Sequence, residues 1–176
     1  LLTMLRDFRD NFSVEIWTQI DPKWSKGVLA ETELITGVIV LIVTGAVAFI
    51  RNNLVGLRVT QCLMATGILI SGTSTLLFQF HQIQPFTWML LLGMGLFLAY
   101  IPVQTVLFER LIGLFKTKAN AGFFVYMCDS IGYLGSAAIL LYKEFFMFHV
   151  SWPDVLIRLC YLLTIISMLL LPACYY

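Results

Sequence analysis

Five apolar segments, each long enough to cross a lipid bilayer, follow one another along this chain with only short polar links between them. They cover residues 32–50, 57–80, 86–108, 119–142 and 155–171. A helix needs about 20 predominantly apolar residues to span the hydrocarbon core of a bilayer. Because no water reaches the backbone there, such a segment must satisfy its own hydrogen bonds and is therefore predicted to be a transmembrane helix.

The composition indicates a membrane rather than water as the main solvent. Of the 176 residues, 60% are hydrophobic and 12% are charged, and the mean hydropathy is +0.89. Soluble domains are about 45–50% apolar and about 25% charged. The lipid bilayer is therefore an expected partner, whereas a formal net charge of +1 lacks the basic surplus of a nucleic-acid binder.

Residues 1–20 form a further segment, which is more polar than the other five and ends at the turn-like pair Asp21-Pro22. With this segment, residues 1–176 are predicted to fold as one all-α domain, a polytopic transmembrane bundle of about six helices. The links are short, so sequential helices are expected to be antiparallel neighbours. The chain does not begin with methionine, and we expect it to be part of a longer polypeptide.

The first segment carries many charges for a membrane helix. At about 100° per residue its polar residues fall on two adjacent arcs, Arg6, Arg9, Asp10 and Ser13 on one and Asp7, Asn11 and Glu15 on the other. Arg6 and Asp10 are spaced to pair, whereas Arg9 needs a partner from another helix or a bound anion. Ionisable residues within membrane helices usually line a cavity or pathway. The alternative is that these charges lie solvated at the membrane surface.

The segment at 119–142 carries a second polar group. Its members recur at helical spacing on an otherwise apolar span: Tyr126, Asp129, Ser130 and Tyr133. Asp129 lies near the middle of the span, and burial disfavours the charged form of a carboxyl group. Asp129 is therefore predicted either to take up and release a proton or to join helices through hydrogen bonds. Asp129 and Tyr133 are expected to face protein or a cavity.

Two smaller features complete the polar residues of the predicted spans. Tyr100 and Gln104, with Thr105 beside them, lie on the turns around Pro102, where a kink is expected. They either line a pore or bond the carbonyl groups that the kink frees. Glu31 and Glu33 are predicted to stabilise the N-terminus of the second helix, where the helix dipole favours carboxylates.

Small residues within the spans are predicted to mark close helix contacts, namely Gly67 and Ser71, Gly93 and Gly95, and Gly132, Gly135 and Ser136. The four cysteines have no metal-site or redox spacing and are interpreted as small buried hydrophobes, at Cys62, Cys128, Cys160 and Cys174. His81 and His149 fall in predicted loops, and no Gly-x-Ser-x-Gly turn occurs. Neither an enzyme, nor a cofactor, nor a metal site is therefore expected.

Three motifs resemble an uncharacterised family of bacterial membrane proteins related to the major facilitator superfamily. They are Leu5-Arg6-Asp7-Phe8-Arg9-Asp10-Asn11-Phe12, Gly95-Leu96-Phe97-Leu98-Ala99-Tyr100-Ile101-Pro102, and Asn120-Ala121-Gly122-Phe123 with Gly132-Tyr133-Leu134-Gly135-Ser136. The resemblance covers nearly the whole chain. It implies helices seven to twelve of a twelve-helix protein in the bacterial inner membrane, with an N-terminal six-helix half of the same polypeptide as partner.

Transporters of this superfamily hold a solute between two six-helix halves, near the midplane of the membrane. The resemblance implies that the first helix of each half lines that cavity. Arg9 is similar to an arginine that binds the anion in the first helix of the organophosphate and phosphate antiporters. One departure is Asp10, where that motif has a second basic residue.

These observations predict half of a secondary active transporter, which moves a small solute by alternating access. An anion is the candidate solute class, and protons are the candidate coupling ion. The expected solute-binding residues are Arg6, Arg9, Asn11, Tyr100, Gln104, Tyr126 and Tyr133, and Asp129 and Asp10 are expected to couple protons or gate. The alternative is a membrane scaffold or sensor that does not transport. Arg9 and Asp129 on a shared concave surface would favour transport, and an Arg9 salt bridge in a closed bundle would favour the scaffold.

Overall fold

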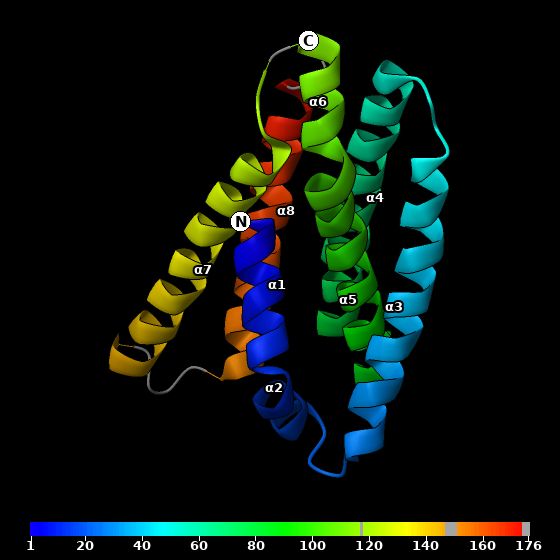
Figure 1. Ribbon diagram of the computed structural model, residues 1–176. Coiled ribbons are helices and arrows are strands. Elements are labelled where there is room, and N and C mark those ends of the chain that lie inside the picture. Colours follow the sequence, from blue (N-terminus) through cyan, green and yellow to red (C-terminus); the bar gives the residue numbers. More distant parts are fainter. Residues whose placement is uncertain (117, 147–150, 174–176) are drawn as a thin grey trace.

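The computed structural model describes residues 1–116, 118–146 and 151–173, and the regular structure in these ranges is entirely helical (Figure 1). The elements in chain order are α1 (Leu2–Asn11), α2 (Ser13–Ile20), α3 (Lys26–Ala48), α4 (Asn53–Gln79), α5 (Pro85–Pro102), η1 (Val103–Leu107), α6 (Phe108–Phe115), α7 (Ala121–Phe146) and α8 (Trp152–Ala173). The predicted all-α class is confirmed.

Five helical segments in the described part of the chain have the length and apolar composition to cross a membrane. They are Lys26–Ala48, Asn53–Gln79, Pro85–Phe115, Ala121–Phe146 and Trp152–Leu170. The Pro85–Phe115 segment is the most buried of them and comprises α5, η1 and α6, whereas α7 is the least buried. A helical membrane bundle is therefore confirmed, with five candidate spans rather than six.

The first segment differs from its prediction, because it is divided into two short helices. Phe12 separates α1 from α2 with φ −110° and ψ 18°, although its N–H still bonds the carbonyl oxygen of Phe8 at 3.1 Å. Helices of 10 and 8 residues are too short to count as spans. Their apolar side is nonetheless fully packed, since Leu5, Phe8 and Ile16 are at most 1% exposed.

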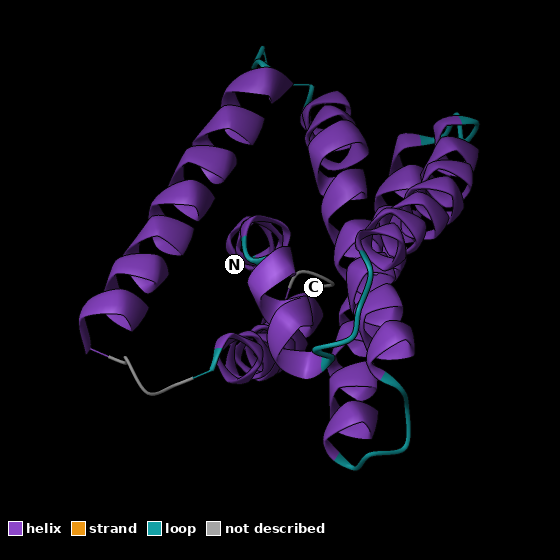
Figure 2. Cartoon of the chain, turned by 90° about the horizontal axis from the view of Figure 1, so that it is seen from below, coloured by secondary structure: helices purple, strands orange, loops and turns teal. Residues whose placement is uncertain are grey.

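The α5 helix is packed among other helices, whereas α7 lies at the edge of the bundle. α5 contacts α1, α3 and α4, while α7 contacts α1 and α6. Figures 1 and 2 show α7 leaning away from the other helices toward its C-terminal end, with α1 between it and the rest. The α1 helix therefore joins α7 to the bundle, and its polar side chains lie between spans.

Small residues lie where helices approach most closely, as predicted. A Cβ added to Gly67 would lie 2.4 Å from the carbonyl oxygen of Gly95, and one added to Gly95 would lie 2.4 Å from the hydroxyl of Ser71. A Cβ on Gly132 would lie 2.4 Å from the Cβ of Thr3. Because these distances are too short for any side chain, α4 with α5 and α1 with α7 can pack in this way only with glycine at these positions.

The helical hydrogen-bonding pattern changes after Pro102, which has no backbone N–H. The α-helix ends there, and η1 continues as a five-residue π-helix before α6. The Thr105 hydroxyl donates to the carbonyl oxygen of Ile101, one turn earlier, at 2.9 Å, whereas the carbonyl that Pro102 deprives of its donor is that of Leu98. The span extends to Phe115, beyond the predicted end at Phe108, because the π-helix lets the chain remain helical.

Near the C-terminal end of α7, Lys143 contacts the start of α8. Lys143 is 9% exposed, and its Nζ lies 3.5 Å from the centroid of the Trp152 ring on α8. The Trp152 ring in turn stacks on Phe12, with ring centroids 4.2 Å apart. Glu144 completes the contact through an ion pair of 3.3 Å with Lys143.

Two sequence interpretations are wrong. The α3 helix begins at Lys26, so Glu31 and Glu33 lie beyond its first turn and do not stabilise its N-terminus. Of the cysteines, Cys160 is buried as predicted, whereas Cys62 and Cys128 are exposed at the helix surface, and Cys174 lies outside the described residues. The first error arose because apolarity placed the start of the helix at residue 32, and the second because neighbouring helices decide which faces of a helix are covered.

Candidate functional site

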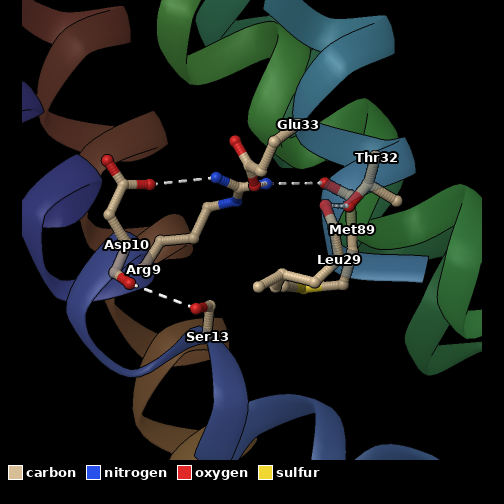
Figure 3. A network of polar contacts seen from close by, with 7 residues as sticks. All are labelled: Arg9, Asp10, Ser13, Leu29, Thr32, Glu33 and Met89. Atoms are coloured by element: carbon tan, nitrogen blue, oxygen red, sulfur yellow. Dashed lines mark hydrogen bonds and ion pairs between the residues drawn. The ribbon is translucent and has the colours of Figure 1, made fainter. Parts of the chain in front are cut away.

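Arg9 is the most deeply buried charged side chain of the first helix. It is 1% exposed, and its two terminal nitrogens are both engaged (Figure 3). Nη1 donates to Oδ1 of Asp10 at 3.0 Å, and Nη2 donates to Oε1 of Glu33 on α3 at 2.7 Å. Nη2 also lies 3.5 Å from the carbonyl oxygen of Met89 on α5. The predicted partner from another helix is thus a carboxylate, Glu33.

The close approach of Arg9 to α5 depends on Gly93. A Cβ at this position would lie 2.5 Å from Nη2 and 2.9 Å from Cζ of Arg9. The guanidinium group therefore lies directly on the backbone of α5. This contact gives Gly93 a second role beside the predicted helix contact, because its missing side chain provides the space for a buried cation.

Beside this ion-pair network lies an open pocket of about 240 Å³ between α1 and α3. It is lined by Asp10, Ser13, Leu29 and Glu33. The Asp10 and Glu33 side chains are 35% and 40% exposed, whereas Arg9 behind them is almost completely covered. The charged groups that reach this pocket are therefore carboxylates.

A second polar cluster surrounds Asp129 on α7. One carboxylate oxygen, Oδ1, accepts hydrogen bonds from the hydroxyl of Thr3 on α1 at 3.3 Å, from the hydroxyl of Tyr100 on α5 at 3.2 Å, and from Nε2 of Gln104 on η1. Gln104 Nε2 also lies 2.8 Å from the Tyr100 hydroxyl. Three helical segments therefore meet at Asp129, and each of these partners is uncharged.

Arg6 connects the same cluster to α1. Its Nη2 donates to the hydroxyl of Tyr133 at 3.2 Å, and its Cζ lies 4.5 Å from the centroid of the Tyr100 ring. Arg6 does not pair with Asp10 as the i, i+4 spacing predicted, because Asp10 is bonded to Arg9. Arg6 instead lies between two phenol rings, one from α5 and one from α7.

Asp7 of α1 also contacts α7. The hydroxyl of Ser136 donates a short hydrogen bond to Oδ2 of Asp7. Next to this bond is an open pocket of about 220 Å³. Its lining comprises Asp7, Asn11, Phe12, Tyr133, Ser136, Ala137 and Leu140. Thus α1 has a pocket on each of two sides, and the charged lining residues of both are acidic.

The predicted site residues are therefore partly brought together. Tyr100, Gln104 and Asp129 form one cluster, which Arg6 and Tyr133 extend. Arg9 and Asp10 belong to the separate ion-pair network, and Asn11 lines the pocket against α7. Asp129 faces protein as predicted, whereas Tyr133 is bonded to Arg6 and yet 45% exposed.

Tyr126 is apart from all of these residues and is 76% exposed. The α1 and α7 helices run parallel, with Thr3 beside Asp129 and Asp7 beside Ser136. Tyr126 lies about one turn before Asp129 on α7 and makes none of these contacts. Spacing along α7 grouped Asp129 with Tyr133, but it carries no information about which residues of α7 lie against α1.

Five polar residues of the site were not among the predicted site residues: Thr3, Asp7, Ser13, Glu33 and Ser136. Asp7 had a signal, since it lies on the second polar arc of the first segment. Ser136 was expected only to allow close helix contact, and Thr3 was not considered. Glu33 was assigned to the helix end. Among the described residues, no group of three or more His, Cys, Asp or Glu side chains is placed to hold a metal ion.

Comparison with known proteins gives a family but no activity. A protein-family model described as "Family of unknown function (DUF5690)" matches residues 1–176. No curated protein and no solved structure matches the chain. The description names no substrate or reaction, so a function has to be argued from the polar contacts of α1, α3, α5 and α7.

Proposed function

The chain belongs to the family of unknown function DUF5690, and we propose that it serves the coupled transport of a small solute across a membrane. The observation that carries this proposal is the concentration of charged and polar groups along α1 inside a bundle of apolar helices. Arg6, Asp7 and Arg9 each bond or stack on a side chain of another helix. Ionisable groups in such positions are costly and usually mark solute or proton pathways.

Asp129 is proposed to carry the coupling proton. Among the described residues, no ion pair within 4.0 Å involves its carboxylate, and its donors Thr3, Tyr100 and Gln104 are neutral. A carboxyl group without a cationic partner loses no ion pair when it takes up a proton. Protonation would weaken the acceptor Oδ1 that three helical segments share, so it would loosen the contact of α7 with α1 and η1.

The proposed architecture is one six-helix half of a larger transporter, in which α1 and α2 together act as the first helix. Support comes from the position of α1, which has a pocket on its α3 side and another on its α7 side. In a protein with two halves of the major facilitator type, such a helix would face the central cavity, and rocking of the halves would expose it alternately to each side of the membrane.

A second candidate function is a membrane scaffold or sensor that does not transport. The observation in its favour is Arg9, which is buried and neutralised by Asp10 and Glu33 within the chain itself. An arginine that is closed in this way can stabilise a fixed helix arrangement. Transport is preferred because Asp129 has no cationic partner among residues 1–116, 118–146 and 151–173, and because the two pockets beside α1 are open and acidic.

The test uses the full-length protein, purified and reconstituted into vesicles that enclose a pH-sensitive dye. Small ammonium, carboxylate and neutral solutes are added outside one at a time, and the internal pH is followed. A proton-coupled transporter changes the internal pH with at least one solute class, and vesicles without protein give the background. Absence of any solute-dependent change, together with absence of uptake of labelled solutes, would support the scaffold instead.

A further inference from the structure

We propose that an apolar pocket between α6 and α7 binds one anionic phospholipid of the membrane, with an acyl chain in the pocket and the head group beside Lys116 and Lys118. This inference goes beyond the proposed function, because it concerns a lipid that stays bound rather than a transported solute. It depends on three properties of this end of the bundle, which are the lining of the pocket, its level relative to the spans, and the surrounding charge.

The first property is that the pocket has an entirely apolar lining. Its volume is about 280 Å³, and its lining residues are Phe108, Leu111, Ile112, Phe115, Ala119 and Phe124. The rings of Phe108 and Phe124 stack between the two helices with centroids 5.7 Å apart, and Phe115 is 69% exposed. Because none of the six lining residues has a polar side chain, the pocket suits a hydrocarbon chain rather than a polar solute.

The second property is the position of the pocket at the ends of two candidate spans. One span ends at Phe115, and the next begins at Ala121. Phe115 and Ala119 line the pocket, so in a bilayer it lies where the hydrocarbon core meets the head-group layer. Lys116 directly follows Phe115, Lys118 directly precedes Ala119, and both lysines are exposed. A lipid with one chain in the pocket therefore has its head group within reach of two ammonium groups.

The third property is the charge at this end of the bundle, where Figure 1 shows the C-terminal end of α6 and the N-terminal end of α4. The basic side chains of the described residues there are Arg51, Arg58, Arg110, Lys116 and Lys118, and the acidic one is Glu109. Arg110 is already engaged, since it donates to Oδ1 of Asn53 at 2.9 Å and to the carbonyl oxygen of Ile50 at 2.7 Å. No ion pair within 4.0 Å among the described residues engages the two lysines, so both are available to a phosphate group.

These charges favour a lipid over a second copy of the chain as the occupant of the pocket. Copies that insert the same way up and pack around an axis along the membrane normal bring their positive ends together, and like charges repel. An anionic phospholipid has the complementary charge, and it supplies the acyl chain and the phosphate group in one molecule. Basic pockets at the ends of membrane helices bind anionic head groups for the same reason.

The binding experiment titrates lipid into the full-length protein in a neutral detergent and counts bound lipid by native mass spectrometry. Phosphatidylglycerol and phosphatidylcholine with the same oleoyl chains differ in net charge, and glycerol 3-phosphate carries the phosphate without a chain. Each basic residue near an anionic surface contributes about fivefold, so we expect phosphatidylglycerol to bind about tenfold more tightly than phosphatidylcholine, or better. Equal affinities of the two lipids, binding of neither, or competition by glycerol 3-phosphate would overturn the inference.

Charge variants locate the head group. Lys116→Gln combined with Lys118→Gln should weaken phosphatidylglycerol binding about tenfold and leave phosphatidylcholine binding unchanged. Lys23→Gln combined with Lys26→Gln is the matched control, because these two lysines are exposed at the start of α3, at the opposite end of the bundle, and it should bind both lipids as wild type does. An equal loss in the two double variants would show a general effect of charge and refute the site.

A pocket variant locates the acyl chain. Ala119→Trp puts a large side chain at the pocket, and it should weaken binding of both lipids about tenfold, or more, because it takes the space of the chain. Ala119 is exposed and lies in the link before α7, so this substitution disturbs no buried contact, and Ala30→Trp at an exposed position of α3 is the matched control. Wild-type lipid affinity in Ala119→Trp would refute the pocket as the site. A wild-type dimer in light scattering that Ala119→Trp converts to a monomer would assign the pocket to a second copy and overturn the inference.

Discussion

Substitution of Gly93 by alanine tests whether the Arg9 ion-pair network is held tightly against α5. The new Cβ would lie 2.5 Å from Nη2, which is 0.9 Å less than the 3.4 Å at which ordinary contact begins. The guanidinium group cannot retreat freely, because it is 1% exposed and bonded to Glu33 at 2.7 Å. Either this bond lengthens or α1 moves away from α5.

The expected cost follows from two opposing effects. Overpacking of a tightly packed interior costs about 1–3 kcal/mol, while alanine stabilises a helix interior by about 0.5–1 kcal/mol relative to glycine. We therefore expect Gly93→Ala to lower the free energy of unfolding by about 1–2 kcal/mol. Gly45→Ala on α3 is the matched control, because a Cβ there meets nothing within 4 Å, and it should be neutral or slightly stabilising.

The assay is reversible unfolding of the purified full-length protein in mixed micelles, followed by tryptophan fluorescence. A double-mutant cycle with Glu33→Gln assigns the cause. If the strain acts through the ion pair, Gly93→Ala should cost at least about 0.5 kcal/mol less once Glu33 no longer holds the guanidinium group. Equal stabilities of Gly93→Ala and Gly45→Ala would show that Arg9 has room to move, which would refute the tight network.

Two further substitutions test how the helices are joined. Gly67→Ala should destabilise the protein by about 2–3 kcal/mol in the same assay, because its Cβ would meet backbone atoms of α5 at 2.4 and 2.8 Å; a loss no larger than that of Gly45→Ala would contradict this contact. Lys143→Leu should cost about 0.5–2 kcal/mol through loss of the cation–π contact with Trp152. Its effect should disappear in a Trp152→Leu background, and an undiminished loss there would assign the role of Lys143 to another partner.

The helical membrane bundle was predictable because it depends on apolar length alone. Helix contacts were predictable at Gly67 and Gly132 for a similar reason, since a small residue in a span permits close approach wherever the partner lies. Asp129 was correctly expected to face protein, because a carboxyl group near the middle of a span needs donors. These predictions use only properties of one segment at a time.

The site itself depends on the register between helices that are distant in the sequence. Glu33 was misassigned because apolarity placed the start of its helix at residue 32, whereas α3 begins at Lys26 and carries Glu33 into the bundle beside Arg9. Tyr126 was expected beside Asp129 and is 76% exposed, since the spacing of α7 does not give the level at which other helices lie against it. Arg9 was expected to need a partner from another helix or a bound anion, and its partners within the chain are Asp10 and Glu33.

Transport by Asp129→Asn in reconstituted vesicles, measured in two modes, tests whether Asp129 carries the coupling proton. With a pH gradient, wild-type protein should accumulate solute and the variant should not, because asparagine keeps the size of the side chain but cannot take up a proton. Exchange of labelled for unlabelled solute, without a gradient, should survive in the variant because it needs no net proton movement. Ser130→Ala, at an exposed position of the same helix, should behave as wild type in both modes. Equal accumulation by wild type and Asp129→Asn would contradict the account and leave Asp129 as a hydrogen-bonded contact between helices.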